Sequence, residues 1–557
     1  RSLTGVRDRH TLRPRWGCWE RNEPRQITTQ QHDRSTVTVG TSLQSAIRVL
    51  ADRPASVVPV YLLVVGLNAA TRVPLLAGIG AVVALLASDG RLQALLDALE
   101  SVDVESIEQQ DPGPEAIPPE LEAAAADLVS PEVILVIAAA GLASLVVGLV
   151  ANGVGSAAAI NGIYGCLYGG DGVADAVVGV GRDWKPFVGL GLVQFGIVLI
   201  GAVPVALGAT LFAVSTPAGI AATAVGGLIS VGIVLVGLAA LAFAGQSIVA
   251  DGVGFGGAVR RSIGFPFRRP VPFVAYLLVA LGVFGGLSVL GGLFGALGVS
   301  QLSGIIGPLA AIPFLDAFKT ALYADRPFAP ADDAEGRIAG IDAAEADGGT
   351  PADSAARPAY RHRIAAAFRD GLGAIGGFVR YHPVPILAAT TLFGLAVAGG
   401  WQLTAAYAVD LPAGSDPGAV FGTFPAGVFV MIAANNWLVS ATAAYGGTVL
   451  GLPTAADMVL NGVIVGALAG VVDPLLFAAL VAPHGVIELP AIVVAGGVGF
   501  HLAALVAGVL RGNRTAADLA SGLRLAYRVL LGLAVVLVVA AFVEAFLTPR
   551  IATVVLG

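Results

Sequence analysis

A histidine and a glutamate stand four residues apart in an otherwise apolar stretch of the sequence, APHGVIELPAIVVAGGVGFH at residues 482–501. A spacing of four places His484 and Glu488 on one face of a helix. A carboxylate about one turn into a membrane is costly unless it is paired or protonated. The pair therefore indicates a proton relay or a cation site, and Asn461 or His501 is the candidate to complete it.

The same residues also have an architectural interpretation. Pro483 and Gly485 mark a turn into a helix, where His484 would hydrogen-bond exposed backbone and Glu488 would meet the positive end of the helix dipole. Both interpretations stay open at this stage. A metal site needs at least three protein ligands, and His501 lies almost five helical turns beyond His484. We therefore predict no metal and no cofactor.

Other polar side chains lie in apolar stretches of the second half of the chain. Three are asparagines, which either line a polar path or serve as hydrogen-bond partners between helices: Asn435, Asn436 and Asn461. Glu544 lies late in the last apolar stretch, near its predicted outer end. In the first half, Asp316 and Lys319 are three residues apart, a spacing that predicts a pair satisfying itself.

The amino-acid composition indicates which kind of secondary structure must position these polar side chains. Hydrophobic residues make up 56% of the chain and charged residues 12%, against about 25% charged residues in ordinary soluble domains. Several runs reach the roughly 20 apolar residues that a membrane helix needs, which excludes an alternating barrel pattern. We predict an all-α, polytopic integral membrane protein with about 11 transmembrane helices in two membrane domains and with interfacial amphipathic helices.

Sequence motifs for catalysis and nucleic-acid binding are missing. The sequence has no GxSxG, HExxH, Walker or Rossmann pattern in a suitable context. Its basic residues follow one side of the membrane and carry no aromatic platform for nucleic acid. We therefore expect neither an enzyme nor a nucleic-acid-binding protein.

The predicted spans alternate with loops whose charge differs between the two sides. Outside residues 1–36, three basic residues fall on the outer side, Arg72, Arg91 and Arg550, and all others fall on the inner side. This excess predicts a cytoplasmic N-terminus and an external C-terminus. The spans are residues 54–71, 131–152, 186–213, 219–249, 270–298, 302–323, 383–408, 424–449, 455–472, 485–508 and 527–547.

Four regions follow from the same pattern. Residues 1–36 are a basic leader, either a disordered tail or a start site placed too far upstream. Residues 37–323 form a six-span domain and residues 363–557 a five-span domain. Between them, residues 324–362 are rich in Asp, Ala, Gly and Pro, which predicts a disordered cytoplasmic linker.

Short amphipathic stretches precede four of the spans, and each ends at a proline: Pro54, Pro186, Pro270 and Pro383. Proline suits the first turn of a helix because its missing N–H would be unpaired there. An amphipathic helix in the headgroup layer, leading into a span, is the physical interpretation. The apolar run from Val73 to Ala87 is predicted to be an interfacial or re-entrant piece, since a separate crossing would invert every later loop.

Three separated blocks resemble the stage II sporulation protein M family over about residues 365–550. They are Asn435-Asn436 with Asn461-Gly462, then Pro483-His484-Gly485 with Glu488-Leu489-Pro490, and Glu544 with Thr548-Pro549. The first domain is faintly similar to uncharacterised archaeal multi-span domains. The acidic, Lys-poor composition also resembles that of proteins from salt-loving archaea.

The resemblance implies a function through assembly. The family's named member belongs to a membrane complex that directs cell-wall remodelling, and the family is widespread in organisms that form no spores. For this chain it implies a non-enzymatic scaffold or remodelling component of a cell-membrane complex. The expected partners are the lipid bilayer and membrane or envelope proteins. The sequence specifies neither the identity of these proteins nor the oligomeric state. The alternative is a transporter or channel component with a polar site around His484 and Glu488.

Overall fold

The computed structural model describes residues 38–100, 119–325, 360–407 and 426–556, and the regular elements within them are all helical. The first half contains α1 (Val39–Asp52), α2 (Pro54–Ala69), α3 (Arg72–Ser88), α4 (Arg91–Glu100), α6 (Pro119–Asp127), α7 (Pro131–Leu167), α8 (Gly172–Thr210), α9 (Thr216–Ala240), α10 (Ala244–Asp251), α11 (Phe255–Arg268), α12 (Pro270–Ala296), α13 (Gln301–Ile306), the π-helical turn η3 (Gly307–Ala311) and α14 (Ile312–Ala324). The second half contains α16 (Tyr360–Tyr381), α17 (Pro383–Thr404), α19 (Ala426–Tyr445), α20 (Leu452–Val471), α21 (Pro474–Leu510), α22 (Ala516–Phe542), the π-helical turn η7 (Val543–Leu547) and α23 (Thr548–Leu556).

The predicted fold class is confirmed. Eleven helical segments of the described residues are long and apolar enough to cross a membrane, and each overlaps one predicted span. The protein is therefore an all-α polytopic membrane protein. The leader and most of the linker lie outside the described residues, and the orientation of the termini stays a prediction.

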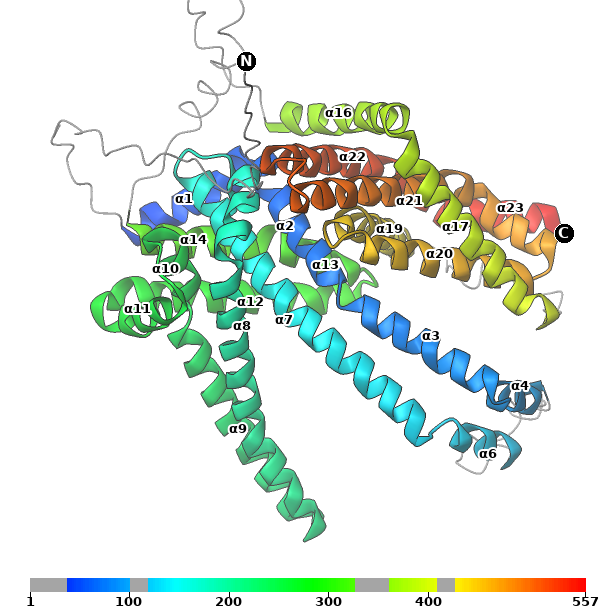
Figure 1. Cartoon of the computed structure of the whole chain (residues 1–557), viewed down its shortest axis with the longest axis horizontal. Coiled ribbons are helices and arrows are strands. Elements are labelled where there is room, and N and C mark those ends of the chain that lie inside the picture. The colour runs from blue at the N-terminus through cyan, green and yellow to red at the C-terminus, as the bar shows by residue number, and fades with distance from the viewer. Residues whose placement is uncertain (1–37, 101–118, 326–359, 408–425, 557) are drawn as a thin grey trace, which may run out of the picture. The chain divides into compact units, whose positions relative to one another are not determined.

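The prolines mark helix starts at three of the four predicted places. Pro54, Pro270 and Pro383 are the first residues of α2, α12 and α17. The amphipathic helices α1, α11 and α16 precede them, and α16 packs along α22 (Figure 1). Pro186 differs because it lies inside α8, which runs through it without a break. The amphipathic stretch and the span are one helix there.

Residues 73–87 lie in α3, which follows α2 after a turn at Ala70 and Thr71 and packs along α7 (Figure 1). A Cβ atom on Gly78 would lie 2.5 Å from the Cβ of Ala140, so the two backbones approach closely. The run is helical and forms one candidate span together with α2, so it adds no separate crossing to the count. Its interfacial or re-entrant position stays a prediction.

The two halves of the chain share one buried core. A single cluster of buried side chains includes Tyr61 and Phe318 from the first half and Tyr445 and Leu523 from the second. An ion pair between Asp171, which caps α8, and Arg524 of α22 also joins them. The described helices of the six-span and five-span regions pack together as one unit. The division of the chain into two membrane domains remains a prediction from the sequence.

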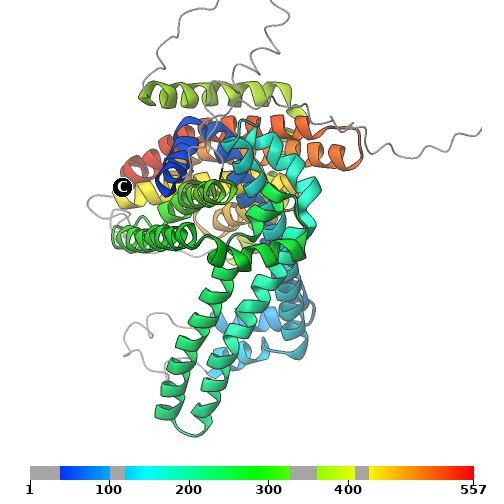
Figure 2. The ribbon, with the colours of Figure 1, turned by 90° about the vertical axis from the view of Figure 1, so that its left-hand side faces the viewer.

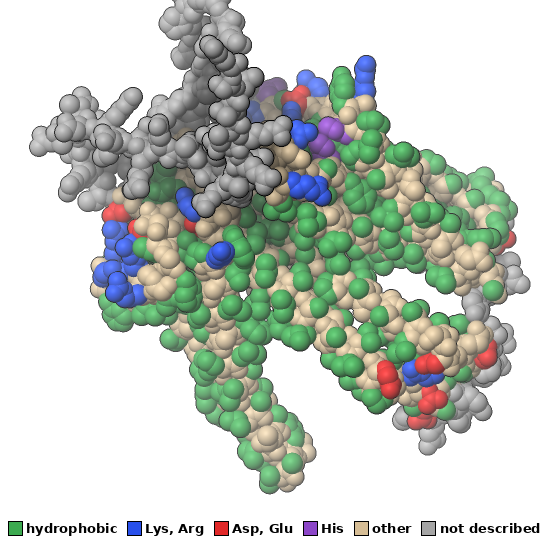
Figure 3. Space-filling view, in the orientation of Figure 1, with side chains coloured by type: hydrophobic (Ala, Val, Ile, Leu, Met, Phe, Trp, Pro, Cys, Tyr) green, Lys and Arg blue, Asp and Glu red, His purple; other side chains and the backbone are tan. Residues whose placement is uncertain are grey.

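The pair formed by α8 and α9 extends away from this core (Figure 2). Exposed apolar side chains cover it, including Leu207, Leu228 and Leu235, and the space-filling view shows hydrophobic side chains and tan surface on its outer part, with no charged side chain in view (Figure 3). Lys and Arg side chains instead gather over α11 (Figure 3). An apolar surface of this extent suits contact with lipid.

Candidate functional site

The structure brings His484, Glu488 and Glu544 together. One ligand atom from each side chain lies within 4.8 Å of the other two, and Nε2 of His484 is 4.0 Å from Oε2 of Glu544. The side chains of His484 and Glu544 are 14% and 24% exposed. Glu544 therefore completes the predicted site in place of Asn461 or His501.

Helix α21 holds the first two of these residues. It begins at Pro474, where the Asp473 carboxylate accepts hydrogen bonds from the N–H groups of Leu475 and Leu476. The helix then runs through Pro483 without a break. The predicted turn into a helix at residues 483–485 is therefore wrong, because the cap lies ten residues earlier. An assignment of His484 to helix capping loses its basis, whereas one shared helical face is confirmed.

The end of α22 supplies Glu544. After Phe542 the α-helical hydrogen-bond pattern changes to the π-helical turn η7, and Thr548 donates a hydrogen bond from its hydroxyl to the Val543 carbonyl oxygen at 3.2 Å. A π turn holds one extra residue and so changes the direction of the side chains within it. Such turns are frequent at functional sites.

The other predicted site residues lie apart from this cluster. Asn461 donates to the Asp457 carbonyl oxygen in its own helix at 2.8 Å, and Asn435 donates to the Asn436 side chain at 3.3 Å. These bonds lie within single helices, so the hydrogen bonds between helices that the structural interpretation expected from the three asparagines stay a prediction. His501 packs against His382, with ring centroids 4.2 Å apart.

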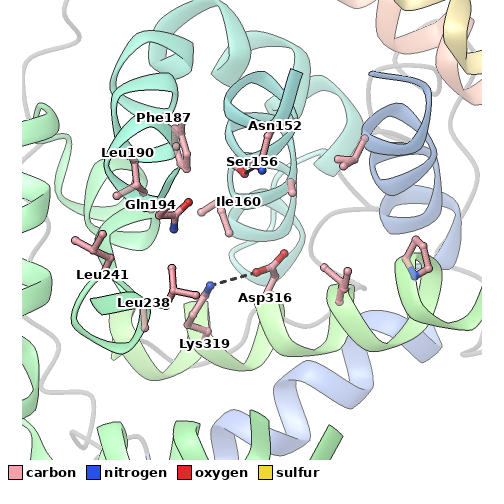
Figure 4. Close-up of a pocket in the computed structure, with 18 of the residues that line it drawn as sticks. Asn152, Ser156, Ile160, Phe187, Leu190, Gln194, Leu238, Leu241, Asp316 and Lys319 are labelled. Carbon is pink, nitrogen blue, oxygen red and sulfur yellow. Dashed lines mark hydrogen bonds and ion pairs between the residues drawn. The ribbon is translucent and has the colours of Figure 1, made fainter. Parts of the chain in front are cut away.

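A cavity of about 1290 Å³ lies in the first half and was not predicted from the sequence. Side chains from several helices, including α2, α7, α8, α10 and α14, line it. Figure 4 shows the Asp316–Lys319 pair facing Asn152, Ser156 and Gln194 across this space. The wall of the cavity is partly polar and partly apolar, because leucines and phenylalanines form much of the rest of it.

The charged groups of the cavity are held by their neighbours. Nζ of Lys319 is 3.4 Å from the Asp316 carboxylate, which confirms the predicted pair. Tyr61 donates from its hydroxyl to the same carboxylate at 2.9 Å, and Lys319 lies 5.9 Å from the ring centroid of Tyr276. In the described part of the chain, Oε1 of Gln246 is buried without a hydrogen-bond partner.

Sequence reasoning missed this cavity because each helix contributes one or two polar residues at ordinary spacing. The Asp316–Lys319 pair was its one visible signal. The lining residues come from stretches separated by up to hundreds of residues, as Tyr61 and Asp316 show. Such convergence depends on how helices cross, which their individual periodicities do not specify.

The fold and composition define a polytopic helical integral membrane protein. The family model described as Stage II sporulation protein M matches residues 387–549. The chain belongs to this family, and the resemblance found in the three sequence blocks is confirmed.

A curated protein is also similar to part of the chain. An uncharacterized protein of Methanocaldococcus jannaschii is 33% identical over 134 residues, which cover 22% of this chain and 73% of that protein. This relative is archaeal, in agreement with the archaeal resemblance. No solved structure matches the chain.

Proposed function

We propose that the chain is a non-enzymatic membrane scaffold, a component of a larger complex that organises the cell membrane or envelope. The observation that carries this proposal is the close packing of the helices within residues 387–549. Most of the residues that line the 1290 Å³ cavity lie outside this region. The candidate asparagines of this region form hydrogen bonds within their own helices and do not line that cavity. A scaffold is expected to keep its polar groups satisfied by neighbouring helices, whereas a permease directs them into an aqueous cavity.

Glycines bring the backbones of these helices into contact. A Cβ atom on Gly371 of α16 would lie 2.6 Å from the backbone nitrogen of Gly532 in α22. A Cβ atom on Gly462 of α20 would lie 2.7 Å from the Phe393 carbonyl oxygen in α17. Small residues at such crossings support tight helix association in membranes. The packing supports a rigid body, which suits a platform for partner proteins.

Side-chain hydrogen bonds between helices add to this rigidity. Trp437 of α19 donates from its indole nitrogen to the Leu530 carbonyl oxygen of α22 at 3.1 Å. Tyr445 donates to the Leu523 carbonyl oxygen of the same helix at 2.8 Å. These two bonds are about two turns apart along α22 and fix its rotation against α19.

Site-specific photo-cross-linking in native membranes tests the scaffold proposal. A photoreactive residue would replace Ile464 or Leu468, each 50% exposed on α20, and buried Met458 of the same helix would be the control position. We expect adducts with other proteins from the exposed positions and none from Met458. Adducts with lipid alone, from these positions and from Leu387 and Leu395 of α17, would contradict the scaffold proposal.

A transporter or channel component is the second candidate, and the cavity beside the Asp316–Lys319 pair favours it. Cysteine labelling tests it in a background with Cys18 and Cys166 replaced by alanine. Ser156 lines the cavity, whereas the adjacent Ala157 is fully buried. A transport path predicts that a small water-soluble reagent modifies Ser156→Cys and leaves Ala157→Cys unmodified. No modification at either position would exclude an aqueous path through this cavity.

A further inference from the structure

We propose that His484, Glu488 and Glu544 bind one divalent transition-metal ion, with zinc as the best match, and that this ion ties α21 to the end of α22. The three ligand-capable atoms come from two chain segments and lie within 4.8 Å of one another. An imidazole and two carboxylates are ligands that zinc accepts. The imidazole disfavours magnesium and calcium, which prefer oxygen ligands.

The distances suit a site that closes around an ion. Tetrahedral zinc with ligands at about 2.0–2.2 Å places them roughly 3.4 Å apart. The Nε2 atom of His484 and the nearer oxygen of Glu544 are 4.0 Å apart. The remaining movement is a fraction of an ångström to about 1.5 Å, which side-chain rotation supplies without moving the helices. Two carboxylates that repel each other are expected to stand slightly apart until a cation enters.

The charge of the cluster also indicates a missing cation. In the described part of the chain, neither Glu488 nor Glu544 forms an ion pair with Lys or Arg, and Glu544 faces His484 and the Glu488 carboxylate. Two partly buried carboxylates in an apolar helix pair are costly unless protons or a cation neutralise them. One divalent ion balances both charges, whereas the alternative is two bound protons.

The histidine provides a second, independent observation. Within the described residues, Nδ1 of His484 is buried and has no hydrogen-bond partner, although Nε2 faces Glu544. A buried polar atom left without a partner destabilises the folded protein. Neither ring nitrogen of His484 therefore has a hydrogen-bond partner within bonding distance among the described residues, and Nε2, which faces Glu544, is free to bind an ion.

The two helical segments form a chelating arrangement. His484 and Glu488 are one turn apart on α21, and the π turn η7 directs Glu544 toward them. Two of the three sequence blocks of the family resemblance thus converge on this point. Three protein ligands leave one position of tetrahedral zinc open to water or to a side chain of a partner.

Metal analysis of the full-length protein purified in detergent tests the proposal. The protein would be incubated with zinc chloride, freed of excess metal and measured by elemental mass spectrometry. We expect about one ion per chain, with binding weakened at least about tenfold in Glu488→Gln/Glu544→Gln. Asp457→Asn, which removes a buried carboxylate of α20 outside the cluster, is the matched control and should keep the ion.

The glutamine variants remove repelling charges, so they are expected to fold without metal. Their thermal midpoints provide a second readout, because zinc should raise the midpoint of the parent protein and leave that of the double variant unchanged. Cobalt bound in place of zinc should also give a visible absorption band that His484→Asn alters. Equal zinc content in the parent protein and the double variant would overturn the proposal and leave a protonated carboxyl pair as the explanation.

Discussion

Gly66 of α2 lies directly against the backbone of Tyr445 at the end of α19. A Cβ atom on Gly66 would overlap the carbonyl group of Tyr445, whose own side chain is fully buried. The two residues belong to the six-span and five-span regions of the sequence. This contact places α2 in the shared core and depends on the absence of a side chain at Gly66.

Replacing Gly66 with alanine should therefore loosen the contact between the two regions. The atoms in the way are backbone atoms, which cannot rotate aside, so we expect a loss of about 1–3 kcal/mol in stability. A thermal-unfolding scan in detergent would measure it. Gly232→Ala on α9 is the control, since a Cβ atom there meets nothing within 4 Å. Equal thermal midpoints for the two variants would contradict the expected overlap.

Replacing Tyr445 with phenylalanine should remove one bond between α19 and α22 while keeping the ring. The lost hydrogen bond to the Leu523 carbonyl oxygen, 2.8 Å long, predicts a decrease of about 0.5–1.5 kcal/mol in stability. The same substitution at Tyr381, which is 72% exposed, should have no measurable effect. Chemical unfolding of both variants beside the parent protein would decide whether this hydroxyl stabilises the helix pair.

Replacing Lys319 with methionine should leave the Asp316 carboxylate without its cation. Removing one partner of a buried ion pair typically costs about 3–5 kcal/mol, and both side chains here are less than one-fifth exposed. The double variant Asp316→Asn/Lys319→Met should recover part of that loss, because no unpaired charge remains. A double-mutant cycle from thermal unfolding measures this coupling, and additive effects of the two substitutions would show that the pair is unimportant for stability.

His382, between α16 and α17, should make stability depend on pH. Burial lowers the pKa of His382, so the folded protein favours the neutral ring. Below about pH 6.5, the ordinary histidine value, the unfolded chain takes up a proton before the folded one does. Stability should therefore decrease as the pH falls from about 7 towards the lower folded pKa.

The variant His382→Gln should reduce this dependence when thermal midpoints are compared across that pH range. The ring of His501 lies beside that of His382 and is unchanged in this variant. Exposed His362, on α16, is the control position. A midpoint of the parent protein that does not change between pH 8 and pH 5.5 would contradict this prediction.

The sequence predicted local features of this protein better than it predicted meetings between distant residues. Proline and apolar run length located the spans, because a membrane helix satisfies its backbone within its own segment. The same reasoning placed His484 and Glu488 on one face. It could not show that Glu544 meets them, because that contact depends on the crossing of α21 with α22 and on the π turn between residues 543 and 547.

The error at Pro483 has a physical origin of the same kind. The turn predicted there rested on the usual helix-breaking effect of proline, which neighbouring helices in a membrane can offset. Helix α21 instead runs through Pro483 without a break.

The π turn η7 has a consequence for changes in chain length. An ordinary α-helix rotates by about 100° per residue. Deleting one residue between Val543 and Leu547 would therefore restore a regular helix and rotate either Glu544 or the residues after it by about 100° around the helix axis. Relatives that keep this site must therefore keep the extra residue, and a one-residue gap there would mark a branch of the family that has lost it. At this turn a change in chain length alters the direction of every later side chain, whereas a substitution changes one side chain only.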